Sequence, residues 1–272
     1  MGTKVRIISE RKGSNPGGKC EISNGFGSFS AYFKYCYGSH IGNGEVSSFN
    51  AHNQPVYEAL TAELARIFGL KTPETFVLLN KRRDVVFYDW REHGGKDPSG
   101  RDYYFVSRMV PNPKSTEENL REKEALNAEI PYLESLLISD IVGRRQNYAF
   151  APNGTYGGDI TYLDLGCSFV HAKEGHLKAA HKLRIATGKD FKKAMKKLNG
   201  KKVMSRDGSR VIGLAELVEG VGEIPIPILS ARKGFLDVWA LISGEEIHEI
   251  QRHLVQGFLD GWEGLRDAGY SV

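Results

Sequence analysis

The chain has 272 residues, of which 40% are hydrophobic, 26% are charged and 10% are aromatic. This composition is typical of a folded globular protein and excludes an intrinsically disordered chain, which would hold fewer aromatic residues. The 37 basic and 33 acidic residues leave a formal net charge of only +4, which is too small to indicate nucleic-acid binding by itself.

Neither the apolar segments nor the cysteines of the sequence indicate export or membrane insertion. The apolar stretch near the N-terminus is short and interrupted by charge, and no later segment approaches the roughly 20 apolar residues that cross a bilayer. The three cysteines, Cys20, Cys36 and Cys167, are widely spaced and lack a pattern typical of zinc sites. We therefore expect a cytoplasmic protein without a membrane partner.

The first part of the sequence predicts strands around one helix. A strand at 5–9 is followed by the glycine-rich loop RKGSNPGGK, and a second strand is expected in SFSAYFKYCYG, at 28–38. Apolar residues spaced three and four apart then predict a helix that begins at Pro55 and ends at Gly69. Further strands are expected at 75–79, 84–90 and 103–110.

Pro111 and Pro113 mark the expected boundary between two parts of the chain, 1–110 and 111–272. The second part is expected to be mostly helical, except for a hairpin around the turn APNGTYGGD. In chain order, the expected elements are a charged helix within 112–130, an apolar helix at 132–142, hairpin strands at 147–150 and 160–163, and helices that end with an amphipathic one at 244–268.

Lys34 is the first candidate for a functional residue. It lies within the apolar run Tyr-Phe-Lys-Tyr of the second expected strand, where a lone ammonium group is costly to desolvate unless an anion lies beside it. Glu58 is its expected partner, because it lies near the start of the following helix and would face the strand if that helix packs on the sheet. The alternative is that Lys34 lies on an edge strand with its charge in water.

The glycine-rich loop is a second candidate. Gly13, Ser14, Gly17 and Gly18 would let backbone N–H groups approach and bind phosphate oxygens. The loop has neither the GxxxxGK[ST] nor the GxGxxG spacing, so the main signatures of P-loop hydrolases and dinucleotide-binding folds are absent. The alternative is an ordinary turn.

A metal site is expected at the hairpin. Asp164 follows its second strand and precedes a glycine, so its carboxylate would project from a strand end, and Asn147 begins the first strand. Kinase-type phosphoryl transfer uses such an amide and carboxylate pair on a magnesium ion that also binds phosphate oxygens. Taken separately, each residue could simply form a turn.

In chain order, these motifs resemble the HipA-like kinases, a family distantly similar to the phosphoinositide 3- and 4-kinases. The segment YEALTAELARIFGLKTPET resembles the helix of the family's small lobe, which implies that Glu58 is the ion-pair partner of the strand lysine, Lys34 in AYFKY. The segment YFVSRMVP resembles the hinge strand, whose backbone around Val106 to Met109 would face the adenine of ATP.

The later motifs extend the resemblance over roughly residues 12–170. LLISDIVGRRQNYAF resembles the segment around the family's catalytic loop, and YLDLGCSF resembles its metal-binding aspartate, which implies that Asn147 and Asp164 are the two metal ligands. The resemblance implies an α+β fold of the two-lobed protein-kinase type, with an N-lobe at 1–110 and a C-lobe at 111–272. ATP and Mg²⁺ would bind between the lobes, and a hydroxyl of a protein or small molecule would accept the phosphate.

The sequence departs from the family pattern where the catalytic aspartate is expected. The position five residues before Asn147 is Val142, and the loop is shorter than in the family. The nearest acid is Asp140, which corresponds better to a structural aspartate of the motif. Arg144 or Arg145 could stabilise charge on the transferring phosphoryl group, and Asp140 could act after a shift of the loop.

Three functions follow from these observations. The first is an ATP- and Mg²⁺-dependent phosphotransferase, and the second is a pseudokinase or non-canonical transferase that binds nucleotide without the usual aspartate. The third is a nucleic-acid-associated module that uses the basic segment from Lys178 to Arg206, where twelve basic or histidine residues stand against one acid, Asp190. Because this segment holds almost no aromatic residues, we instead interpret it as a solvated helix face or a docking site for a phosphorylated or acidic partner.

Overall fold

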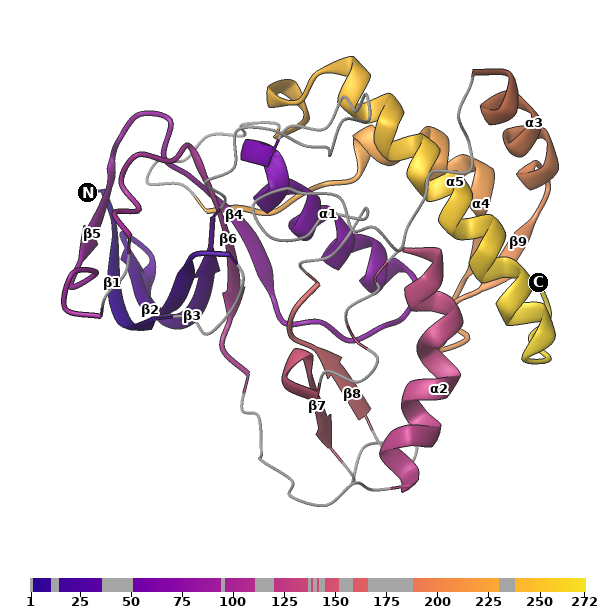
Figure 1. Cartoon of the computed structure of the whole chain (residues 1–272), viewed down its shortest axis with the longest axis horizontal. Coiled ribbons are helices and arrows are strands. Elements are labelled where there is room, and N and C mark those ends of the chain that lie inside the picture. The colour runs from indigo at the N-terminus through magenta and orange to yellow at the C-terminus, as the bar shows by residue number, and fades with distance from the viewer. Residues whose placement is uncertain are drawn as a thin grey trace.

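The computed structural model of the chain is a mixed α+β fold with one large sheet (Figure 1). The structure describes residues 2–10, 15–35, 51–93, 96–110, 120–136, 138, 141, 145–151, 159–165, 188–229 and 238–272. Within these ranges the strands are β1 (Thr3–Glu10), β2 (Gly17–Asn24), β3 (Gly27–Lys34), β4 (Thr75–Leu79), β5 (Val85–Tyr88), β6 (Tyr103–Arg108), β7 (Tyr148–Ala151), β8 (Asp159–Tyr162), β9 (Lys202–Met204), β10 (Val211–Gly213) and β11 (Ile228–Leu229). The α-helices are α1 (Gln54–Ile67), α2 (Leu120–Ser135), α3 (Gly188–Leu198), α4 (Leu214–Glu219) and α5 (Gly244–Asp267), and 3-10 turns are formed by Ala51–Asn53, Arg145–Asn147, Val221–Glu223 and Val238–Leu241.

The large sheet has seven strands in the order β11-β4-β6-β3-β2-β1-β5. Strand β1 alternates buried Val5 and Ile7 with exposed Lys4 and Arg6, whereas β6 is buried over Tyr103 to Ser107 on both faces. Neighbouring strands are antiparallel, except that the edge strands β5 and β11 pair in parallel with β1 and β4. The sheet therefore includes a strand from late in the chain. The remaining strands form two hairpins, β7-β8 and β9-β10.

Two hydrophobic cores lie on opposite faces of this sheet. Alternate residues of β6 belong to different cores, because successive side chains of a strand point to opposite faces. Val106 lies in the smaller core, against which Trp90 packs, whereas Phe105 lies in the larger core. Helix α1 contacts β4 and β6 on the Phe105 side (Figure 1). The larger core thus joins the sheet to the helices.

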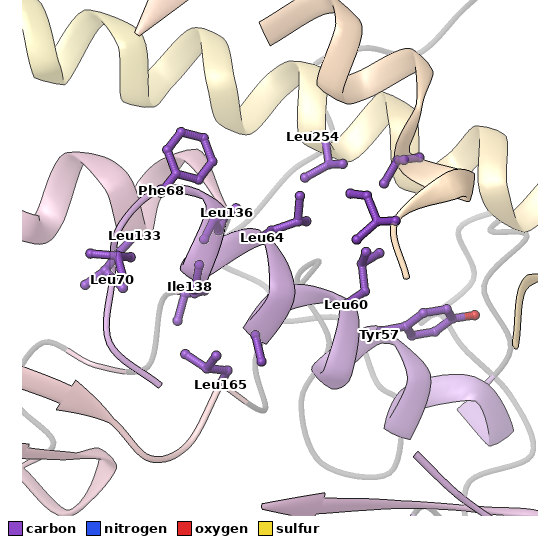
Figure 2. Packing of buried hydrophobic residues seen from close by; sticks show 14 of the residues in the cluster. Tyr57, Leu60, Leu64, Phe68, Leu70, Leu133, Leu136, Ile138, Leu165 and Leu254 are labelled. Atoms are coloured by element: carbon purple, nitrogen blue, oxygen red, sulfur yellow. The ribbon is translucent and has the colours of Figure 1, made fainter. Parts of the chain in front are cut away.

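Helix α1 is buried because it packs against the sheet and against α5. Figure 2 shows Leu60 and Leu64 of α1 in one core with Leu254 of α5. At its N-terminus, α5 begins with a capping box in which Glu246 also accepts a hydrogen bond of 2.8 Å from Asn53 Nδ2. The starts of both helices are therefore tied together by a buried polar contact.

Helices α2 and α5 approach closely at one glycine. A Cβ atom added to Gly261 of α5 would lie 1.9 Å from Ser135 Oγ and 2.7 Å from the carbonyl oxygen of Pro131, both on α2. No real Cβ atom tolerates contacts of this length. The contact between the two helices therefore requires glycine at position 261.

Several expected elements are confirmed. The structure has a strand at Thr75–Leu79, a helix that ends just before Gly69 and an antiparallel hairpin of β7 and β8. The helix expected at 244–268 is α5. Expected strands at 5–9, 28–38, 84–90 and 103–110 correspond to β1, β3, β5 and β6 with shifted ends, and residues 36–38 lie outside the described part.

Other expectations are wrong. The glycine-rich loop was expected to extend to Lys19, but β2 begins at Gly17, where Cys20 and Ile22 alternate with exposed Lys19 and Glu21. An apolar helix was expected at 132–142, but α2 runs through Pro131 and ends at Ser135. It ends because the carbonyl oxygen of Leu133 accepts hydrogen bonds from the N–H groups of both Leu136 and Ile138, at 3.1 and 3.0 Å. The C-terminal part also contains β9, β10 and β11 and is not only helical.

Within the described ranges, no helix combines the length and the apolar character that a membrane crossing requires.

Candidate functional site

Lys34 is the last residue of β3, and its side chain is buried on the face of the sheet that α1 covers. Its cross-strand neighbours are Gly17 on β2 and Phe105 on β6, and the Phe105 ring centroid lies 5.2 Å from Lys34 Nζ. Because β3 lies between two strands and the Lys34 side chain is only 7% exposed, the alternative of a solvated edge lysine is wrong. The ammonium group therefore needs anionic partners.

Glu58 is the first of these partners. Lys34 Nζ donates to Glu58 Oε2 over 3.0 Å, and the Glu58 side chain is 2% exposed. Glu58 reaches the lysine because α1 packs on β4 and β6, and its position near the start of α1 places it over the end of β3. The ion pair expected from the sequence is therefore present in the structure.

Asp164 is the second partner, and it comes from a distant part of the chain. Lys34 Nζ donates to Asp164 Oδ1 over 2.6 Å. Asp164 follows β8, and the next residue, Leu165, is buried in the larger core near Ile138 (Figure 2). This anchoring fixes the backbone on one side of Asp164, while its carboxylate stays 24% exposed. Of the two carboxylates at Lys34, only Asp164 has substantial access to solvent.

Asn147 lies beside Asp164 across the base of the hairpin. The Asn147 carbonyl oxygen accepts hydrogen bonds from the N–H groups of Leu163 and Asp164, at 2.8 and 3.2 Å. Asn147 ends the 3-10 turn before β7 and is buried. Lys34, Glu58 and Asp164 therefore meet in one place, although they come from β3, α1 and the end of the hairpin, and the Asn147 backbone lies next to Asp164.

Two carboxylates accept from the Lys34 ammonium group at this place, and Asp164 carries the more exposed of them. An amide oxygen and a carboxylate suit Mg²⁺, which takes few protein ligands and completes its shell with phosphate oxygens and water. The described residues contain no cluster of three or more His, Cys, Asp or Glu that would hold a metal by themselves. By ligand chemistry, Asn147 and Asp164 are the residues that could hold a magnesium ion arriving with a phosphate ligand.

Gly17 and Gly18 have a structural explanation. A Cβ atom on Gly17 would lie 2.0 Å from the carbonyl oxygen of Phe33, and one on Gly18 would lie 2.1 Å from that of Ser9. Both glycines are thus required by close strand pairing in β2. Gly17 nevertheless lies opposite Lys34, next to the candidate site. Gly13 and Ser14 lie outside the described residues.

The expected hinge residues are not brought to the Lys34 cluster. The Val106 side chain lies in the smaller core, on the opposite face of the sheet. The backbone N–H group of Met109 donates to the carbonyl oxygen of Ser30 over 3.0 Å, and that of Arg108 donates to the carbonyl oxygen of Glu74 over 2.9 Å. These two N–H groups therefore already have protein partners.

The expected catalytic residues fall mostly outside the described part. Asp140 and Arg144 lie outside it, and for Arg145 only the backbone is described, in the 3-10 turn before β7. Sequence reasoning missed Phe105, whose ring packs on the Lys34 ammonium group. It also missed the buried contacts Tyr148–Glu122 and Tyr162–Glu129, which join the hairpin to α2.

No protein-family model matches this sequence, and a search of curated proteins found no significant relative.

Proposed function

We propose that this chain is an ATP- and Mg²⁺-dependent phosphotransferase of the HipA-like type, which acts on a hydroxyl of a protein or small molecule. In this proposal the fold is a two-lobed kinase-like one, in which the sheet and α1 belong to the small lobe. The hairpin and the C-terminal helices belong to the large lobe.

The convergence of Lys34, Glu58 and Asp164 carries the proposal. The two carboxylates lie 24 and 130 residues from the lysine along the chain, yet both accept hydrogen bonds from its ammonium group. A buried lysine held by a helix glutamate, beside an aspartate that follows a hairpin strand, is the combination that kinase-type phosphoryl transfer requires.

Each residue has a role that follows from its burial. Lys34 binds phosphate oxygens, and Glu58, the more buried carboxylate, holds the lysine in place. Asp164 is the carboxylate that can exchange Lys34 for a metal ion, with Asn147 as the second ligand. Bound MgATP supplies the phosphoryl group and the positive charge that stabilises it during transfer.

Asp164→Asn tests the proposal, because it removes the charge of the metal ligand and keeps its size. We expect wild-type protein to bind ATP more tightly with Mg²⁺ than with EDTA, and Asp164→Asn to weaken binding in Mg²⁺ by about tenfold or more. Isothermal titration calorimetry measures both affinities. Asp190→Asn, on the exposed first turn of α3, is the matched control and should bind like wild type. Absence of ATP binding by the wild type in both buffers would refute the proposal.

A pseudokinase is the second candidate, because Val142 stands where the resemblance places the catalytic aspartate. Incubation with ATP labelled on the γ-phosphate separates the two. Label that appears on the protein or on an added acceptor supports transfer, whereas Mg²⁺-dependent binding without label supports the pseudokinase.

We also propose that the exposed face of α3 binds an acidic protein segment. Residues 188–202 contain seven lysines and one acid, which gives this segment a formal charge of +6. The whole chain carries +4, so the rest of the chain carries −2. Buried Ala194 and Leu198 lie on the face that packs toward α5, which leaves the lysines in solvent. Lysines three and four apart repel one another, and an acidic partner relieves this repulsion. The exposed lysines of α3 are Lys189, Lys192, Lys193, Lys196 and Lys197.

Charge reversal on α3 tests this surface. We expect Lys193→Glu/Lys196→Glu to weaken binding of a fluorescein-labelled polyglutamate peptide by about tenfold or more in an anisotropy titration at low salt. Lys4→Glu/Lys19→Glu, at exposed positions of β1 and β2, changes the net charge equally and should leave the affinity within about twofold. Equal losses in both variants would show a net-charge effect and no α3 site. Tighter binding of duplex DNA than of the peptide would favour a nucleic-acid partner instead.

A further inference from the structure

Two buried tyrosines fix the hairpin to α2. Tyr148 of β7 and Tyr162 of β8 are directly opposite each other in the antiparallel register. The Tyr148 hydroxyl donates to Glu122 Oε1 over 2.9 Å, and the Tyr162 hydroxyl donates to Glu129 Oε2. The two glutamates are seven residues apart on α2, which places them two turns apart on one face of the helix. The hairpin is thus held at two points along α2.

The contact at Glu129 includes a third element. Arg206 follows β9, and its Nη1 atom lies 2.6 Å from Glu129 Oε1. The backbone N–H group of Arg206 donates to the carbonyl oxygen of Phe68 at the end of α1. The Glu129 side chain has no exposed surface. Glu129 therefore holds β8 through a fully buried and charge-compensated contact.

These contacts lie next to the candidate metal ligands. Asn147 immediately precedes Tyr148, and Asp164 follows Tyr162 by two residues. The Asn147 carbonyl oxygen joins the two ends of the hairpin through the N–H groups of Leu163 and Asp164. A sideways shift of either strand on α2 would therefore move both ligands relative to Lys34.

Burying two carboxylates costs free energy that an apolar contact would not, so stability alone does not account for this arrangement. Polar contacts of this kind instead fix one geometry, because each hydrogen bond is lost if the strands slide. An apolar interface between hairpin and helix would tolerate such sliding.

We infer that Tyr148 and Tyr162 are positioning residues, which hold Asn147 and Asp164 in place for Mg²⁺-bound nucleotide through Glu122 and Glu129. The inference rests on the proposed function. It assigns these tyrosines to the metal-dependent part of nucleotide binding, whereas Lys34 and Glu58 contribute with or without metal.

Tyr162→Phe tests the inference, because it removes one hydroxyl and leaves Glu129 paired with Arg206. The measured quantity is the ratio of the ATP dissociation constant in EDTA to that in Mg²⁺, from calorimetry. We expect the ratio to fall about tenfold, as for other residues that orient metal ligands, while the EDTA value stays within about twofold of wild type. Tyr132→Phe is the control, since Tyr132 is also a buried tyrosine but its hydroxyl donates to the Met204 carbonyl oxygen and not to Glu122 or Glu129. Its ratio should match wild type.

The outcomes separate this inference from the proposed function. A wild-type ratio retained in Tyr162→Phe, or an equal loss in both buffers, overturns the positioning role and leaves the proposed function intact. Wild-type protein that binds no ATP in either buffer overturns both. If Tyr162→Phe does not fold, the same ratio of dissociation constants is measured for Tyr148→Phe, and the same outcomes support or overturn the inference. This variant removes the other hydroxyl and leaves the Glu129–Arg206 ion pair untouched.

Discussion

Replacing Lys34 by methionine should lower the free energy of unfolding by about 3 kcal/mol or more, because it leaves Glu58 buried without its cation. The same substitution should weaken ATP binding by about tenfold to hundredfold, since a charge-assisted contact to phosphate is lost. Denaturant titration followed by circular dichroism measures the first effect, and calorimetry measures the second. Lys19→Met is the matched control, because Lys19 lies exposed on the neighbouring strand β2, and it should change neither quantity.

A double variant separates stability from binding at this position. Lys34→Met/Glu58→Met replaces the buried pair by apolar side chains, so most of the lost stability should return. ATP binding should stay weak, because the lysine is still absent. If the double variant instead regains ATP affinity together with stability, Lys34 is only a structural ion-pair residue and has no role in binding phosphate.

Gly261→Ala should destabilise the protein by about 2–3 kcal/mol, although alanine favours helix formation by about 1 kcal/mol over glycine. The added methyl group would meet the Ser135 N atom at 2.8 Å and the Pro131 carbonyl oxygen at 2.7 Å. Backbone atoms cannot rotate away, so α2 and α5 must separate. Because α2 also carries Glu122 and Glu129, we expect the Mg²⁺-dependent gain in ATP affinity to fall in the same variant.

Gly264→Ala is the control for this prediction, one turn along the same helix. Its Cβ atom would meet the flexible end of Glu134 at 3.4 Å and Pro131 Cβ at 3.7 Å, which are tolerable contacts. We expect a stability change of at most about 1 kcal/mol, in the stabilising direction. Equal destabilisation by both substitutions, measured by denaturant titration, would contradict a specific close approach at Gly261.

The Lys34–Glu58 ion pair could be predicted because both residues carry local signals. A lysine inside an apolar strand needs an anion, and the apolar spacing of α1 indicates a helix that packs on the sheet. The hairpin that brings Asp164 to Lys34 could also be predicted, because its turn residues indicate two paired strands. These features depend on short segments whose pattern fixes their geometry.

Other features depend on tertiary contacts that local patterns do not contain. The glycines that begin β2 indicate a loop until their close pairing with Ser9 and Phe33 is known. The end of α2 carries no glycine, so the apolar run after it predicts more helix. The hydroxyl partners of Tyr148 and Tyr162 depend on where α2 lies, and the place of β6 in the middle of the sheet depends on the strand order.

The strand β11 has a consequence for synthesis on the ribosome. The N–H group of Val77 in β4 donates to the carbonyl oxygen of Pro227, and Ile228 and Leu229 pair with Val77 and Leu78. During translation, β11 emerges about 150 residues after β4, an interval on the order of ten seconds at typical elongation rates. Throughout that interval the nascent sheet has an unpaired border that can recruit other chains. Co-translational chaperone binding to the segment around β4 should therefore end only after residue 229 has left the exit tunnel.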